Sequence, residues 1–260
     1  MRRILIHAGF HKTGTTGLQE TLRANLHALS PHIQVVLRPS MKALCASARA
    51  YSRSRSDLDL GLVKYEASLL LDGLHAEAAE TIILSSEDLS GHMPGRYGLR
   101  SYGAAPHVMR ALALACKTTA PKASCGFFFT TRAGGPWLHS CYSQHLLNTR
   151  MVMDETEYVK RFGPSADHAA IIAQVKAEVP DNTVTLTTLE AYADAPLGIA
   201  GALLDCLDLD PAIRAALVPT DKPAALLSEP SNDQLLALNR SDLDDASLRA
   251  EKRMLLKGAA

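Results

Sequence analysis

The sequence predicts a three-layer α/β fold in which helices flank a central parallel sheet. Short apolar, β-branched or aromatic runs, which are typical of buried strands, occupy residues 4–8, 81–85, 125–131 and 183–189. Helical patterns of apolar residues occupy residues 15–29, 64–79, 105–116, 136–147, 166–178 and 197–207. Because the strands alternate with helices, we expect a parallel sheet with right-handed crossovers.

The first element is a strand that leads through a loop into a helix. The apolar run 4–8 ends in Gly9, and the segment after Gly14 places leucines at helical spacing (Leu18, Leu22, Leu26 and Leu29). The loop between strand and helix therefore lies at the carboxyl edge of the predicted sheet, where open α/β folds bind ligands.

Two polar regions need a different interpretation. Residues 40–59 are rich in serine and arginine, so we predict a solvated loop or a short helix, with a basic patch for substrate as the alternative. Beyond residue 210 the chain is charged and helical, and Leu248 with the run 254–256 indicates an amphipathic helix that packs on the sheet or on a second subunit. We expect one domain over residues 1–260 with a helical extension from about residue 211.

Composition excludes several classes of partner. The chain has 260 residues, of which 47% are hydrophobic, and its 27 lysines and arginines balance 27 aspartates and glutamates. The net charge therefore creates no overall electrostatic attraction for nucleic acid or an anionic membrane, and an anion must be held by a local site. No apolar run reaches the roughly 18 residues that cross a bilayer, so we expect no membrane span and a cytoplasmic location.

Cysteine and histidine usage argues against a metal site and a disulfide framework. The five cysteines are odd in number, scattered and never in CxxC spacing (Cys45, Cys116, Cys125, Cys141 and Cys206). The histidines other than His11, His92 and His139 show no HxxxH or HExxH spacing. We expect reduced cysteines that mostly pack in the core, and no metal.

The loop GFHKTGTT has the glycine spacing of a triphosphate-binding loop but not its lysine. Gly9 and Gly14 match GxxxxG, whereas Thr15 stands where the lysine of GxxxxGK[ST] is expected, and Lys12 comes earlier. Backbone N–H groups, the positive end of the helix and the hydroxyls of Thr15 and Thr16 still suit one phosphate. The alternative is that Gly14 and Thr15 only make a turn and a helix cap.

The stretch HKTGTTGLQ resembles the 5′-phosphosulfate loop of the sulfotransferases that use 3′-phosphoadenosine 5′-phosphosulfate (PAPS). The resemblance implies that Lys12 contacts the oxygen bridging phosphate and sulfate. It further implies that Thr13, Gly14, Thr15 and Thr16 complete the cofactor loop, and that the fold is of the P-loop type.

A second stretch, FFFTTRAGGPWLHSCY, resembles the 3′-phosphate segment of the same family. Arg132 follows the most apolar strand, and Ser140 comes eight residues later, which implies that both side chains bind the 3′-phosphate. An arginine fork suits a phosphate dianion. Ala133–Gly135 replace the family's usual Asp-Pro start, and the alternative is that Arg132 forms a surface ion pair and Ser140 is an ordinary helix residue.

A hydroxyl acceptor also needs a general base near the donor. Glu87 follows the strand 81–85 and is the first candidate, and His92 and His11 are the alternatives. Each has a structural interpretation too: Glu87 as a cap or ion-pair partner, His11 as a residue that orients the loop, and His92 as a pocket-lining or solvated side chain. The segment 90–105 resembles an acceptor loop and contains Arg96, Arg100 and two tyrosines.

These features predict a PAPS-dependent sulfotransferase. It would move a sulfuryl group to a hydroxyl or amine of a carbohydrate or small metabolite, with Lys12 offsetting charge on the departing oxygen, and would leave adenosine 3′,5′-bisphosphate. No metal and no nucleic acid are expected, and a homodimer is possible. Two alternatives remain: a non-catalytic nucleotide-binding protein of the same fold, and a P-loop kinase of small metabolites.

Overall fold

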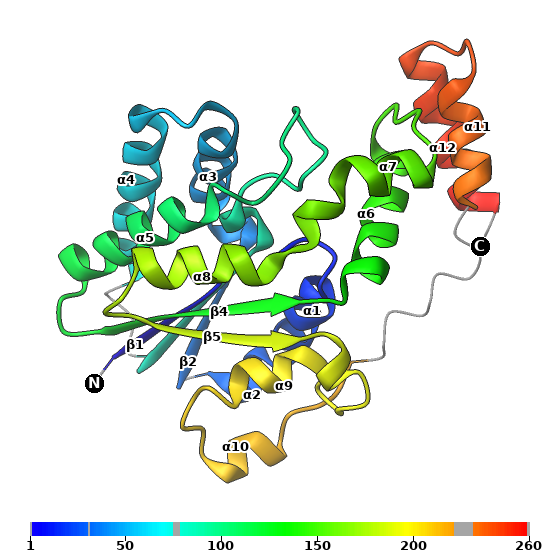
Figure 1. Ribbon diagram of the computed structural model, residues 1–260. Helices are drawn as coiled ribbons and strands as arrows, with labels where there is room; N and C mark the ends of the chain where they lie inside the picture. Colours follow the sequence, from blue (N-terminus) through cyan, green and yellow to red (C-terminus); the bar gives the residue numbers. More distant parts are fainter. Residues whose placement is uncertain (1, 31, 75–78, 221–230, 259–260) are drawn as a thin grey trace. The chain divides into compact units, whose positions relative to one another are not determined.

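The protein is built on a five-stranded parallel sheet. The computed structural model describes residues 2–30, 32–74, 79–220 and 231–258. The strand order is β2-β3-β1-β4-β5 (Figure 1), and the strands are β1 (Arg3–His7), β2 (Ile33–Leu37), β3 (Thr81–Ser85), β4 (Ser124–Thr131) and β5 (Thr183–Thr188). The predicted parallel sheet is therefore confirmed.

All strands run the same way, so their carboxyl ends meet at one edge. His7 of β1 pairs with Ser85 of β3 on one side and with Phe128 of β4 on the other. Chain connections after β1 and β4 leave in opposite directions, because β1 leads to β2 and β4 leads to β5. Such a switch point is where open α/β sheets bind ligands.

Helices cover both faces of the sheet, as the three-layer prediction requires (Figure 1). One face is covered by α1 (Thr15–Ala24), α2 (Leu26–Leu29) and α9 (Gly198–Leu204). The other face is covered by α3 (Lys42–Ser54), α4 (Asp57–Leu74), α5 (Ala105–Thr119) and α8 (His168–Glu178). This arrangement is the predicted P-loop type of α/β fold.

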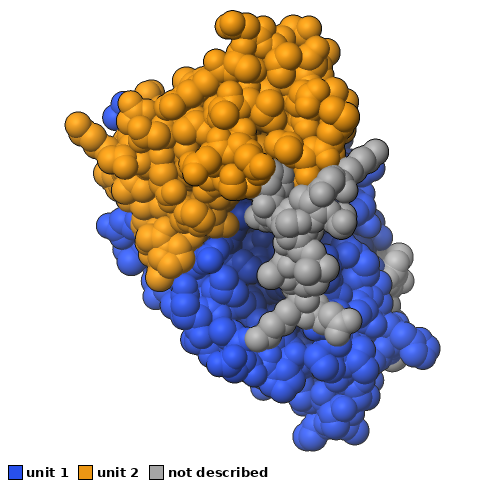
Figure 2. All heavy atoms as spheres, turned by 90° about the vertical axis from the view of Figure 1, so that its right-hand side faces the viewer, with its two compact units in different colours: residues 1–132, 167–220 blue, residues 133–166, 221–260 orange. Residues whose placement is uncertain are grey.

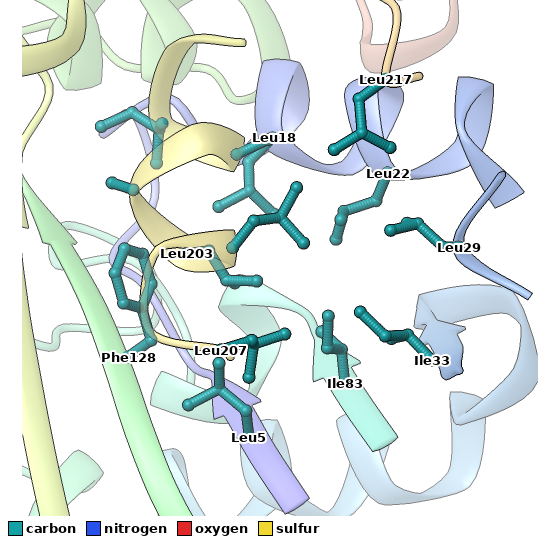
Figure 3. Close-up of a cluster of buried hydrophobic side chains, with 14 residues drawn as sticks. Leu5, Leu18, Leu22, Leu29, Ile33, Ile83, Phe128, Leu203, Leu207 and Leu217 are labelled. Atoms are coloured by element: carbon teal, nitrogen blue, oxygen red, sulfur yellow. The ribbon is translucent and has the colours of Figure 1, made fainter. Parts of the chain in front are cut away.

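Buried side chains point alternately to the two faces of the sheet along each strand. Leu5, Ile83 and Phe128 point to the face covered by α1 and α9, where they meet Leu18 and Leu203 (Figure 3). Their neighbours along β1 and β4, such as Ile4 and Phe129, point to the opposite face and are fully buried. Burial on both faces explains why the sequences of these strands are continuous apolar runs.

Several elements differ from the sequence prediction. The segment 40–59 is not a solvated loop, because α3 buries a stripe at helical spacing (Leu44, Cys45, Ala48 and Tyr51). The predicted helix 15–29 is divided at Asn25, whose side-chain amide bonds to the carbonyls of Thr21 and Val218. Strand β2 and helix α7 (Glu155–Phe162) were not predicted.

The chain divides into two compact units, coloured separately in Figure 2. Unit 1 comprises residues 1–132 and 167–220 and contains the sheet, and α10 (Pro211–Ala215) belongs to it. Unit 2 comprises residues 133–166 and 221–260 and contains α6 (Gly134–Asn148), α7, α11 (Asn232–Arg240) and α12 (Asp245–Gly258). The single domain with a C-terminal extension stays a prediction.

Unit 2 is held together by buried polar contacts to the end of α6. Lys252 of α12 donates to the carbonyls of Leu146 and Thr149 at 2.6 and 2.8 Å, and Asn239 of α11 donates to the same Leu146 carbonyl at 3.1 Å. Leu248 is buried, whereas Met254 is 57% exposed. The predicted amphipathic helix is thus present, with its inner face packed within unit 2.

Some further properties bear on function. Within the described residues, no helix combines the length and the apolar character needed to cross a bilayer. All five cysteines are free thiols. In the same part of the chain, the side chains that ligate metals form no group of three or more.

Candidate functional site

The loop between β1 and α1 is shaped by its two glycines. A Cβ at Gly9 would lie 2.5 Å from Nε2 of His7 and 2.6 Å from Oγ1 of Thr130, so only glycine fits between them. Gly14 has a left-handed φ of 91°, which side chains rarely adopt, and a Cβ there would meet Leu189 at 2.7 Å. The glycine spacing seen in the sequence therefore has a steric cause at each end of the loop.

Lys12 is held in an unusual conformation. Its φ of 66° is in the left-handed region, although it is not glycine. Such a conformation costs a non-glycine residue on the order of 1 kcal/mol and is concentrated at functional sites. The loop thus sets the direction of the Lys12 side chain through its backbone.

The threonines of the loop have different environments. Thr13 is fully buried, and its hydroxyl donates to the Phe10 carbonyl at 2.6 Å and accepts from the Thr130 hydroxyl at 2.6 Å. Its side chain therefore anchors the loop to β4. Thr15 is buried at the start of α1, and Thr16 is exposed.

The amino end of α1 has no side-chain cap. Gly14 is the N-cap residue and supplies no side-chain hydrogen bond, and the first turn contains no acidic residue. The first N–H groups of a helix lack partners within the helix, and the dipole is positive there. A phosphate group is a suitable acceptor for these donors.

A buried histidine lies beneath the loop. His7, the last residue of β1, is fully buried, and its Nδ1 lies 2.7 Å from the Ser85 hydroxyl of β3. Burial lowers the pKa of His7 to about 3, so the imidazole is neutral at physiological pH. It supports the loop through its close approach to Gly9 and was not predicted as part of the site.

His11 links the loop to a second cluster of side chains. The Tyr102 hydroxyl accepts from the His11 backbone N–H at 3.1 Å and lies 3.1 Å from His11 Nδ1. If Tyr102 donates its single proton to Nδ1, the ring proton is on Nε2, which lies 3.8 Å from an oxygen of Asp88. Tyr102 itself is buried, and its ring packs against Phe10 at 4.6 Å.

One carboxylate oxygen of Asp88 forms ion pairs with two arginines. Arg38, which follows β2, and Arg49 of α3 lie 2.6 and 2.7 Å from Oδ2 of Asp88. Burial would raise the pKa of Asp88, but the His11 imidazole and both guanidinium groups outweigh it and hold that pKa far below its usual range. The carboxylate is therefore charged at all physiological pH values.

The two remaining candidates for the base also lie after β3. Glu87 begins the short helix η2 (Glu87–Ser90), and its carboxylate accepts from Gln19 of α1 at 2.9 Å. His92 follows η2 and is half-buried. Burial, with the charges of Arg49 and Arg96, lowers the pKa of His92 to about 4. The His92 imidazole is therefore neutral at physiological pH.

The two predicted 3′-phosphate residues belong to different units. Arg132 directly follows β4 in unit 1 and is half-buried. Ser140 is in α6 of unit 2, two turns from the start of that helix at Gly134. Gly134 and Gly135 lie in the first turn of α6.

Sequence reasoning therefore identified the loop but missed the Asp88 cluster. Asp88 stands next to Glu87 in the sequence, and nothing local distinguishes a carboxylate that meets two arginines from one that meets Gln19. Arg38 and Arg49 come from segments fifty and thirty-nine positions away. The only local signal was the arginine content of residues 40–59.

Similarity to known proteins is found at the level of structure. No family model and no curated protein matches the chain. A sulfotransferase from Alicyclobacillus acidocaldarius is similar in structure, with a TM-score of 0.46, 16% identity and coverage of 100% of this chain and 93% of that one. A protein assigned as a kinase from Chloroflexus aurantiacus J-10-fl has a TM-score of 0.35, 13% identity and coverage of 79% of this chain and 96% of that one.

Proposed function

We propose that this protein is a sulfotransferase that uses PAPS as its donor. The observation that carries the proposal is the loop of residues 9–16, which joins an uncapped helix end to a lysine held in a left-handed conformation. The lysine precedes Gly14, whereas a triphosphate loop has it afterwards. This order favours a phosphosulfate over a nucleoside triphosphate.

In this proposal the loop holds the 5′-phosphate and Lys12 acts on the leaving group. Backbone N–H groups at residues 14–16, with the hydroxyls of Thr15 and Thr16, would donate hydrogen bonds to the phosphate oxygens. Thr13 contributes through its backbone and anchors the loop through its side chain. When bound, PAPS supplies the sulfuryl group. As the sulfur–oxygen bond breaks, Lys12 offsets the negative charge that develops on the oxygen.

Arg132 and Ser140 are proposed to bind the 3′-phosphate. Arg132 forms no ion pair with the described residues and carries a guanidinium fork that suits a phosphate dianion. Ser140 would add a hydroxyl donor from α6. A monomeric or homodimeric cytoplasmic enzyme is compatible with this proposal.

Glu87 is our first choice for the general base. It would take the acceptor's proton while the acceptor oxygen forms its bond to sulfur. His92 is the second choice, since its imidazole is neutral above pH 4 or so. His11 directs both ring nitrogens at other groups, so we assign it the role of positioning the loop against Asp88.

Calorimetric titration with adenosine 3′,5′-bisphosphate tests the proposal. We expect binding to the unchanged protein, weaker binding to Arg132→Ala, and no change in Lys122→Ala, an exposed lysine before β4 at the opposite edge of the sheet. Transfer of labelled sulfate should fall by about 10²–10³-fold in Lys12→Ala. Absence of bisphosphate binding at millimolar concentration would overturn the proposal.

Two other outcomes identify the alternatives. Magnesium-dependent binding of ATP in place of the bisphosphate would indicate a small-metabolite kinase, for which the Gly9 and Gly14 spacing is the supporting feature. Bisphosphate binding without sulfate transfer to any acceptor would indicate a non-catalytic nucleotide-binding protein.

A further inference from the structure

We propose that the acceptor carries an anionic group of its own and that a set of four arginines recognises it. This set, named here the arginine face, consists of Arg38, Arg49, Arg53 and Arg96. The inference rests on the proposed function and adds the chemical class of the acceptor. All four arginines belong to unit 1.

The first part of the arginine face is the pair on Asp88. Arg38 and Arg49 both reach the same carboxylate oxygen, so two positive charges meet one negative charge. A guanidinium has five N–H donors in a planar fork, and one donor from each arginine makes this contact. A net positive charge and several donors therefore remain for a ligand.

The second part lies around His92 and Tyr97. The backbone N–H of His92 donates to Ser52 of α3 at 3.1 Å, which places residues 91–104, the teal-green loop of Figure 1, beside α3. The His92 and Tyr97 rings lie 4.7 Å apart, and the Arg53 guanidinium lies over the Tyr97 ring at 4.3 Å. Arg53 is thus held by an aromatic face.

Few negative charges oppose these arginines. No carboxylate of the described residues is within ion-pair distance of Arg53 or Arg96, and one nitrogen of Arg96, Nε, is buried without a hydrogen-bond partner there. Glu87 is the other acidic side chain whose charge acts on Arg38, and it is bonded to Gln19. Two of the four arginines thus share one carboxylate, the other two pair with no carboxylate of the described residues, and an anionic ligand would balance the excess of positive charge.

The position of the arginine face suits an acceptor site. Asp88 connects it to His11, the residue before Lys12, and both Arg38 and Asp88 follow strands at the carboxyl edge of the sheet. The donor loop starts at the same edge. An acceptor bound here would therefore lie beside the proposed donor site and near Glu87 and His92.

The chemistry favours a small acidic hydroxyl compound. Arginine forks bind carboxylate and phosphate groups in a bidentate manner. Tyr97 is 64% exposed, and the part of its ring that Arg53 does not cover can contact the apolar face of a sugar ring. A sugar acid or a sugar phosphate combines these two features, whereas a neutral sugar has only the second.

Calorimetry with three matched ligands tests the inference: glucose, glucuronate and glucose 6-phosphate. We expect at least one acidic ligand to bind at least ten-fold more tightly than glucose. Its binding should weaken as the salt concentration is raised. The double variant Arg53→Gln with Arg96→Gln should lose most of this preference. Arg23→Gln, which removes an exposed arginine at the end of α1, should keep it. Equal affinity for glucose, no acidic binding, or an unaffected double variant would overturn the inference.

Separate titrations distinguish its failure from failure of the proposed function. Adenosine 3′,5′-bisphosphate binding without acidic-sugar binding would overturn the acceptor class and keep the sulfotransferase. Acidic-sugar binding that depends on Arg53 and Arg96, without bisphosphate binding, would keep an anion-binding face and overturn the sulfotransferase. Comparison of glucuronate with glucose 6-phosphate identifies which anionic group is preferred.

Discussion

The donor loop and the arginine face lie at the same edge of the sheet but are stabilised in different ways. The loop is fixed by steric fit at Gly9, by left-handed backbone at Lys12 and Gly14, and by the buried hydroxyl of Thr13. The arginine face is fixed by charge, through one carboxylate that two guanidinium groups share. A rigid loop suits a constant donor, and a charged surface suits selection among acceptors.

The largest expected effect concerns the steric fit of the loop. Gly9→Val would place side-chain atoms where Nε2 of His7 and Oγ1 of Thr130 already lie, at 2.5 and 2.6 Å from the first added carbon. We expect a loss of about 3 kcal/mol in the free energy of unfolding, measured with urea. Gly17→Ala is the control, because no atom lies within 4 Å of its added carbon. It should gain about 0.5–1 kcal/mol as a helix residue.

A stable Gly9→Val protein would mean that the loop moves away from β4 without cost. The loop would then resemble the arginine face in being adjustable, and the contrast between the two regions would disappear.

The next effect concerns the charge of the arginine face. Asp88→Asn removes the carboxylate between Arg38 and Arg49, and the two guanidinium groups would then repel each other. We expect a loss of about 2 kcal/mol, less than for a fully buried pair because the Arg38 side chain is 53% exposed. Asp208→Asn is the matched control, since Asp208 is fully exposed and its 3.8 Å pair with Arg3 should contribute little to stability.

The Asp88 effect should also depend on pH. A carboxylate whose pKa is lowered on folding contributes stability above the pKa of the unfolded state, and that stability is lost as pH falls. The difference between the unchanged protein and Asp88→Asn should therefore shrink below about pH 4. A difference that stays constant down to pH 2 would contradict the assignment.

The same contrast explains what could be predicted from the sequence. The loop is a contiguous stretch, so the spacing of its two glycines located it, although the side chains that exclude a Cβ at these glycines include Thr130 and Leu189 from distant segments. The buried strands β1, β3 and β4 were predicted because burial on both faces requires uninterrupted apolar runs.

The rest depends on contacts between distant segments. For the region of α3 the sequence left a solvated loop or a short helix open, because its serines and arginines outnumber the buried stripe that includes Leu44 and Tyr51. Strand β2 was missed because the polar side chain of Gln34 interrupts its apolar run, and Gln34 and Val35 are only half-buried. The Asp88 cluster joins residues from three segments, and no local pattern specifies which carboxylate they share.

A further effect concerns the buried base of the loop. The His7 pKa falls from 6.5 to about 3 on folding, so the unfolded state binds more protons than the native state between these values. Stability is then full above pH 6.5 and declines as pH falls, by about 2 kcal/mol at pH 5 from this residue. His7→Asn keeps a side-chain nitrogen or oxygen near the Ser85 hydroxyl but does not titrate.

The measurement is urea unfolding of both proteins at pH 7.5 and pH 5. His7→Asn is expected to be less stable at pH 7.5 and to lose about 2 kcal/mol less than the unchanged protein on acidification. His92 and His168, whose pKa values fall to about 4, contribute a decline that both proteins share. Equal declines in the two proteins would contradict a buried neutral His7.

The smallest expected effect separates the backbone of Lys12 from its side chain. Its φ of 66° costs a residue with a Cβ about 1–2 kcal/mol, whereas glycine adopts it freely but loses more entropy on folding. Lys12→Gly should therefore be more stable than Lys12→Ala by about 0.5–1 kcal/mol in urea unfolding, and both should lose sulfate transfer. Equal stability would show that the loop relaxes around position 12. A gain in stability together with a loss of transfer would show that the chain keeps a strained residue there because the lysine side chain is needed.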